Sequence, residues 1–385
     1  MENALQARKQ AAHPGLMMVS MLLGAFVGMF SETSLNIALP KLMTAFQVST
    51  STIQWLVTGY MLIIGIILPL SSIITKWFTT RHVIIFALID FMVGACISAL
   101  AHNFTILLIG RMIQGIGTGL ILPLMFAVVM QIFPPKQIGA VLGMCALVIM
   151  FAPAIGPTLT GLILAKLSWQ WIFWLFIPFL FIALIFAITS LENVGEITKP
   201  HVDVLSIIES AVGCSGLVIG ASLASEDGWT SPTVLSALII GIIVLIFYTH
   251  RQLHLEEPIL NLHIFKYPAF TIGSSIVMLD FGIILSTMYL LPLFYQRGLL
   301  VSVALTGLVM LPGGIINAAT SAIAGRLYDS IGAKRPVLIG FVLALFGALM
   351  LAFTTPHSPI IYVVCAHIIL MVGCPLAMSP AQTGA

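Results

Sequence analysis

The chain has 385 residues, of which 60% are hydrophobic and only 7% are charged, and its formal net charge is +2. Soluble domains carry about 25% charged residues, so this composition excludes a soluble globular protein. It predicts an all-α protein that crosses the membrane many times and lies mostly in the lipid bilayer. The small net charge gives no indication of a nucleic-acid partner, and we expect none.

Twelve apolar segments are long enough to cross a hydrocarbon core about 30 Å thick. They lie near residues 16–37, 52–76, 82–101, 104–132, 138–165, 169–191, 204–224, 231–249, 270–296, 302–324, 336–354 and 358–379. Most connections are short. Two longer ones, near residues 192–203 and 250–267, carry the Pro, Glu, Lys and His that the spans lack.

Basic residues are distributed unequally between the two sides of the membrane. If the N-terminus is cytoplasmic, eleven lysines and arginines fall on the cytoplasmic side, and the other side has only Lys41, Lys166 and Arg297. Cytoplasmic loops carry such an excess. We therefore expect a multi-pass protein of the plasma membrane with a cytoplasmic N-terminus.

Five ionisable side chains fall inside predicted spans, where a charge costs about 2.5–3.5 kcal/mol on insertion scales and usually faces a cavity or a partner. They are Glu32, Asp90, Arg111, Glu209 and Asp280. Asp280 lies near the middle of its span and either binds a proton or cation or makes a structural hydrogen bond. Asp90 and Glu209 either have a structural role, in which they bridge neighbouring helices or stabilise a local kink, or take part in transport. No cluster of His, Asp or Glu predicts a metal site.

Arg111 precedes Gln114 by three residues, so both side chains lie on one helix face. The arginine is either a cation in a cavity, able to sense the protonation of a nearby carboxylate, or a side chain that reaches the outer interface. Glu32 lies near the middle of the first span, close to Asn36, and either faces a cavity or reaches headgroup water. Phe281 and Tyr289 are aromatic candidates for the wall of an apolar pocket.

Residues 152–161 place two prolines and two glycines inside one predicted span, including Gly156, Pro157 and Gly161. Proline removes a backbone donor and glycine removes a side chain, so this helix is expected to be kinked and closely packed against protein. The pattern is either an ordinary structural kink or a functional motif.

These motifs together resemble the major facilitator superfamily, and within it the fourteen-span drug:proton antiporters of the lincomycin-resistance type. The similarity lies in residues 111–119, in Gly156-Pro157 with Gly161, in residues 168–173 with Pro178, in Gln54-Trp55 with Tyr60, and in residues 257–265. The resemblance implies that the first of these segments takes part in proton coupling. It implies that Gly156, Pro157 and Gly161 form the antiporter motif of exporters.

The segment Gly325-Arg326-Leu327-Tyr328-Asp329-Ser330-Ile331-Gly332-Ala333-Lys334-Arg335 resembles the cytoplasmic loop motif of the superfamily. A carboxylate among basic residues can make charge-assisted contacts in one arrangement of the helices and break them in another. We call this segment, with Gly325, Arg326, Asp329, Gly332, Lys334 and Arg335, the conformational latch. An ordinary solvated loop is the alternative. The corresponding first-half loop, residues 71–81, keeps only Lys76 and Arg81.

The family pattern also implies a division of the chain. Residues 1–191 would form an N-terminal six-helix bundle, residues 192–267 two extra spans and a cytoplasmic linker, and residues 268–385 four helices of a C-terminal bundle. Fourteen spans would leave two closing helices absent, so we expect a C-terminally truncated chain. The family's acidic residue in the first helix matches Ser31 rather than Glu32.

The resemblance predicts a proton-coupled multidrug efflux transporter that exports small hydrophobic or cationic drugs in exchange for protons, driven by the proton motive force without a cofactor. Arg111, Gln114, Glu32 and Asp280 would couple the protons. An uptake transporter of the same superfamily and a truncated remnant without transport activity remain alternatives. A membrane-embedded enzyme would require clustered catalytic side chains, which the spans lack.

Overall fold

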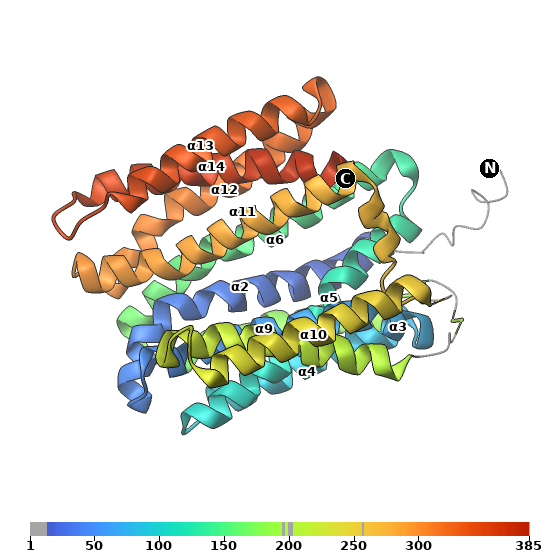
Figure 1. The fold of residues 1–385 in the computed structure, drawn as a ribbon, viewed down its shortest axis with the longest axis horizontal. Coiled ribbons are helices and arrows are strands. Elements are labelled where there is room, and N and C mark those ends of the chain that lie inside the picture. The colour runs from blue at the N-terminus through green and yellow to red at the C-terminus, as the bar shows by residue number, and fades with distance from the viewer. Residues whose placement is uncertain (1–13, 195–196, 199–202, 256–257, 385) are drawn as a thin grey trace. The chain divides into compact units, whose positions relative to one another are not determined.

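The computed structural model of the protein describes residues 14–194, 197–198, 203–255 and 258–384, with some helical side chains in these ranges left undescribed. The described chain is helical throughout (Figure 1). Its elements are α2 (Pro14–Phe46), α3 (Thr50–Trp77), α4 (Thr80–Ala99), α5 (Phe104–Ile132), α6 (Pro135–Lys166), α7 (Trp171–Trp174), α8 (Phe176–Ser190), α9 (Val204–Asp227), α10 (Pro232–His254), η1 (Leu262–Lys266), α11 (Pro268–Leu293), η2 (Phe294–Gly298), α12 (Val303–Ile331), α13 (Lys334–Ala352) and α14 (Ile360–Gly384).

Among the described residues, twelve helical segments are long and apolar enough to cross a membrane, which confirms the predicted number and order of spans. The first helix was expected to end near residue 37, and it continues through Pro40 to Phe46. A proline inside a membrane helix bends it without ending it when neighbouring groups satisfy the freed carbonyl. The expected sixth span is interrupted at Leu175, between α7 and α8.

The chain forms two compact units, and α2 and α6 contribute to both. Unit 1 comprises Met1–Gly28, Leu42–Val141 and Phe173–His263. Unit 2 comprises Met29–Lys41, Leu142–Ile172 and Ile264–Ala385. The three-part division expected from the family pattern stays a prediction.

Helices in unit 1 approach closely where glycines face each other. A Cβ atom added to Gly94 of α4 would lie 2.7 Å from the carbonyl oxygen of Gly110 in α5. A Cβ atom added to Gly216 of α9 would lie 2.8 Å from the Cα atom of Gly241 in α10. Small residues allow this backbone approach, which drives helix association where lipid removes most of the hydrophobic contribution.

Unit 2 uses the same kind of contact between α13 and α14, which lie side by side (red in Figure 1). A Cβ atom added to Gly340 would lie 2.5 Å from the backbone nitrogen of Ala377. Beside this contact, Ala344, Leu370, Met371 and Cys374 form a buried cluster. The central part of α14 is therefore held firmly within unit 2.

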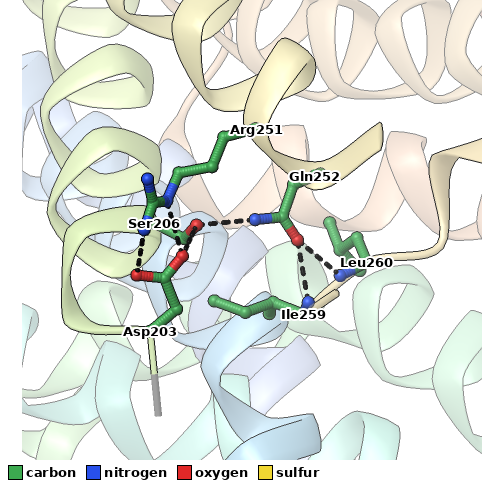
Figure 2. A network of polar contacts seen from close by, with 6 residues as sticks. All are labelled: Asp203, Ser206, Arg251, Gln252, Ile259 and Leu260. Carbon is green, nitrogen blue, oxygen red and sulfur yellow. Dashed lines mark hydrogen bonds and ion pairs between the residues drawn. The ribbon is translucent and has the colours of Figure 1, made fainter. Parts of the chain in front are cut away.

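A polar network joins the start of α9 to the end of α10 (Figure 2). Asp203 accepts two hydrogen bonds from the Arg251 guanidinium, from Nε at 2.6 Å and from a terminal nitrogen at 2.9 Å. Gln252 donates to Ser206 at 2.7 Å and accepts from the backbone N–H of Ile259 at 2.8 Å. The network therefore fixes both the helix pair and the chain that follows it.

Candidate functional site

Arg111 of α5 lies inside unit 1 with none of its surface exposed. Its Nε donates to the carbonyl oxygen of Leu56 at 3.2 Å, and a terminal nitrogen donates to Oε1 of Gln114 at 2.7 Å. The guanidinium carbon also lies 4.0 Å from the ring centroid of Tyr60, a cation–π contact. The side chain is therefore an internal cation and does not reach the interface. Arg111 and Gln114 are in contact, as their spacing predicts.

Tyr60 of α3 connects the arginine to α2 and to a second position on α5. Its hydroxyl donates to the carbonyl oxygen of Gly28 in α2 at 2.9 Å and lies 2.7 Å from Oγ1 of Thr118 in α5. Thr118 in turn donates to the carbonyl oxygen of Gln114 at 3.3 Å. In the sequence, Tyr60 was named only as part of a family motif. The spacing of four residues between Leu56 and Tyr60 predicts that both side chains lie on one face of α3.

Asp90 and Glu209 differ in their surroundings, although the sequence analysis grouped them. Asp90 of α4 accepts a hydrogen bond from the backbone N–H of Gly117 in α5 at 3.0 Å. It therefore bridges two helices, which is one of the two expected roles. Glu209 of α9 has a buried Oε2 atom with no hydrogen-bond partner among the described residues.

The Gly/Pro segment of α6 packs closely against two other segments of unit 2. A Cβ atom on Gly156 would lie 2.5 Å from Oγ1 of Thr33 in α2. A Cβ atom on Gly161 would lie 2.8 Å from the carbonyl oxygen of Val303 in α12. Thr158 donates to the carbonyl oxygen of Gly307 in α12 at 2.7 Å. The expected close packing of this helix is confirmed.

Unit 2 contains a cavity of about 40 Å³ lined mostly by apolar side chains. Its polar lining residues are Glu32 and Thr33 from α2, Asn317 from α12 and His367 from α14. Glu32 is only 8% exposed, so it faces the interior rather than headgroup water. Phe281, an aromatic candidate from the sequence, also lines the cavity. The space holds water molecules, whereas drug-sized ligands occupy about 300–1,000 Å³, so drug binding requires the walls to move.

Asp280 of α11 precedes Phe281 and is completely buried. Neither carboxylate oxygen has a hydrogen-bond partner in the described part of the chain, and the neighbouring polar group is the thiol of Cys374 in α14. Both expected roles of Asp280, binding of a proton or cation and a structural hydrogen bond, therefore stay predictions. Asn36 of α2 is also buried, and its Oδ1 atom has no partner within the same ranges.

His367 is a cavity residue that the sequence analysis missed. It is 2% exposed, and neither ring nitrogen has a hydrogen-bond partner among the residues that the structure describes. The available signal was a histidine in the middle of an apolar span.

The conformational latch lies at the junction of α12 and α13. Gly332 adopts a φ of +74° between these helices, a conformation that favours glycine, and Lys334 and Arg335 begin α13. Gly325, Arg326 and Asp329 lie on α12, but their surroundings are outside the described side chains. The expected ionic contacts of the latch are therefore untested.

Comparison with known proteins identifies the family. Residues 21–385 match the Major Facilitator Superfamily. The chain belongs to the major facilitator superfamily. It is 48% identical over 368 residues to the lincomycin resistance protein LmrB of Bacillus subtilis (strain 168), covering 95% of this chain and 77% of that protein. It is 45% identical over 374 residues to LmrB of Listeria innocua, covering 97% of this chain and 79% of that protein.

Solved structures show the same superfamily fold. The xylose transporter XylE of Escherichia coli, in a partially occluded inward-open conformation, matches with a TM-score of 0.66 at 15% identity. The match covers 97% of this chain and 85% of XylE. The family and these neighbours are transporters, and the two lincomycin resistance relatives support drug efflux by a member of the major facilitator superfamily.

Proposed function

We propose that the protein is a proton-coupled multidrug efflux transporter of the plasma membrane. It exports small hydrophobic or cationic compounds in exchange for protons, and its N-terminus lies in the cytoplasm. The names of the relatives, lincomycin resistance proteins, support a drug as substrate. The paired helices α9 and α10, between α8 and α11, support a place in the fourteen-span branch.

The observation that carries proton coupling is the fully buried guanidinium of Arg111. A permanent positive charge inside a helical bundle is costly unless the protein uses it. The hydrogen bonds to Leu56 and Gln114 and the ring of Tyr60 hold the guanidinium in position. Arg111 therefore supplies a fixed positive potential that favours the ionised form of a carboxylate brought near it.

Glu32 and Asp280 are the carboxylates proposed to carry the proton. Both are buried, and Glu32 lines the cavity in unit 2. An ionised Glu32 attracts a cationic drug, whereas protonation removes that attraction. Drug and proton then compete for one group, and this competition links their fluxes in opposite directions.

The antiporter motif has a packing role in this proposal. Gly156 and Gly161 bring α6 against α2 and α12 within unit 2, and Pro157 offers its carbonyl to the same contact surface. A closely packed α6 excludes water from the transport path, which prevents protons from leaking without drug. The conformational latch, with Gly332 at its turn, is proposed to stabilise one arrangement of the helices at the cytoplasmic ends of α12 and α13.

Export of ethidium from inverted membrane vesicles tests the proposal. Vesicles containing the wild-type chain should accumulate ethidium when energised, and a protonophore should abolish the accumulation. The Arg111→Ala variant should lose it as well, whereas Arg297→Ala, which removes an exposed arginine, should retain it. Accumulation that persists with the protonophore would contradict proton coupling. Cells that take up more ethidium on expression would favour an uptake transporter instead.

A further inference from the structure

His367 presents an unusual combination of burial and unused hydrogen-bonding capacity. Its ring is 2% exposed, and Nδ1 and Nε2 are both without a partner in the described part of the chain. A buried polar group left unsatisfied costs about 1–3 kcal/mol. An apolar side chain of similar size would avoid this cost, so the imidazole is available for a partner beyond the described residues, such as a bound ligand.

The ring position is fixed by the backbone of α12. A Cβ atom added to Gly313 would overlap Cε1 and Nδ1 of the imidazole, so the ring lies directly against the glycine. One helical turn further along α12, Asn317 donates to the sulfur of Met371 at 3.3 Å and lines the same cavity as His367. The cavity wall built by α12 and α14 therefore presents an imidazole and an amide, both held by packing.

The remaining lining defines the chemistry of a ligand. Five methionines and one phenylalanine, including Met310 and Phe281, contribute to the wall, and Glu32 from α2 adds one carboxyl group. Methionine is flexible and adapts to different apolar shapes. A neutral imidazole offers one donor and one acceptor. These groups suit a molecule with an apolar body, a positive charge and a hydrogen-bond donor.

We propose that His367 is a ligand-binding residue of this cavity and that it selects lipophilic cations carrying an amino or hydroxyl group over those without one. This inference rests on the proposed efflux function. The cavity of about 40 Å³ is too small for such a ligand, so the ligand enters it after the walls separate. A cation without a polar group leaves the imidazole buried and unsatisfied, and it therefore binds less well.

A matched pair of probes tests the selection. Ethidium carries two aromatic amino groups, and 5-ethyl-6-phenylphenanthridinium has the same ring system and charge without them. In energised vesicles, the wild-type chain should export ethidium with a kcat/KM about 5–150 times higher, the range that 1–3 kcal/mol represents. The His367→Phe variant should lose this preference through a fall in ethidium export, with export of the other probe within about twofold of wild type.

Two further variants complete the experiment. His367→Gln keeps a donor and an acceptor and should retain part of the preference for ethidium. His357→Phe changes an exposed histidine before α14 and should leave the preference unchanged. An equal fall for both probes in His367→Phe would indicate a packing role and would overturn the proposal. A changed dependence on the pH gradient for both probes alike would place His367 in the proton path and would also overturn it.

Binding separates this inference from the efflux proposal. If wild-type vesicles export neither probe, the proposed function fails. The purified chain in detergent should nevertheless show a larger thermal stabilisation by ethidium than by the phenanthridinium, and His367→Phe should remove the difference. Equal stabilisation of the wild-type chain by both probes would contradict the role assigned to His367.

Discussion

Gly161 provides a quantitative test of the packing between α6 and α12. An added Cβ atom would lie 2.8 Å from the backbone carbonyl oxygen of Val303. Favourable contacts begin near 3.5 Å, so α12 has to retreat by roughly 0.7 Å. The hydrogen bond from Thr158 to Gly307, now 2.7 Å long, would then lengthen beyond the usual limit of about 3.0 Å for hydroxyl donors.

The free-energy cost of overpacking in Gly161→Ala can be separated from other effects by comparison with a second glycine. Overpacking costs about 1–3 kcal/mol, whereas replacing glycine by alanine in a helix gains about 1 kcal/mol. Gly282 of α11 has no atom within 4 Å of an added Cβ, so Gly282→Ala receives the helical gain without the clash. The difference between the two variants is therefore about 1–3 kcal/mol, with Gly161→Ala the less stable.

Equilibrium unfolding of both variants in mixed detergent micelles measures this difference. Proton leak into proteoliposomes without drug gives a second readout, and Gly161→Ala should leak faster than Gly282→Ala. If the free energies of unfolding of the two variants agreed within a few tenths of a kcal/mol, the close packing of α6 on α12 would be refuted. Equal leak rates alone would refute the proposed sealing role of this helix.

Three further predictions concern charged groups. Arg111→Lys keeps the positive charge but cannot form the two guanidinium hydrogen bonds, to Leu56 and Gln114, at the same time. Drug export driven by a pH gradient should therefore fall at least about tenfold. An export rate equal to that of the wild type would contradict the role of these hydrogen bonds. Asp280→Asn should unfold no more easily than wild type, because an amide of nearly the same size replaces the carboxyl group. It should nevertheless lose proton-driven export, and unchanged export would remove Asp280 from the coupling. The hydrogen bonds from Arg251 hold the pKa of Asp203 at about 2, below its ordinary value of 3.8. The contribution of this pair to the free energy of unfolding is therefore fully present above pH 3.8 and is lost as the pH falls through about 2. Arg251→Gln should therefore lower the stability slightly near neutral pH, as is typical of an ion pair in contact with solvent, and should have no effect below pH 2. Unfolding measured across this pH range tests this, and a destabilisation that persists in acid would contradict the ionic account.

The helices were predictable because each span is a long apolar segment, and the bilayer thickness imposes a minimum length on such segments. The contact of Arg111 with Gln114 was predictable for a similar reason, since a spacing of three residues places both side chains on one helix face. The close packing at Gly156 and Gly161 followed from the absence of side chains. Each of these features is local in the sequence.

The missed features depend on contacts between distant residues. Tyr60 reaches Gly28 and Thr118 from another helix, and no periodicity along one segment indicates that meeting. His367 contacts Gly313 across more than fifty residues. The pairing of Asp203 with Arg251 depends on how α9 and α10 are joined. The sequence therefore predicts which residues share one face of a helix. Which residues of other helices contact that face is known only from the folded structure.

Proton exchange in proteoliposomes tests the central claim most directly. Purified chain is reconstituted with ethidium inside, a pH-sensitive dye in the lumen and the membrane potential clamped with potassium and valinomycin. Antiport predicts that outward movement of ethidium acidifies the lumen, because coupling between the two ligands is reciprocal, and that Arg111→Lys abolishes this acidification. Ethidium that leaves without a change in luminal pH would contradict proton-coupled efflux.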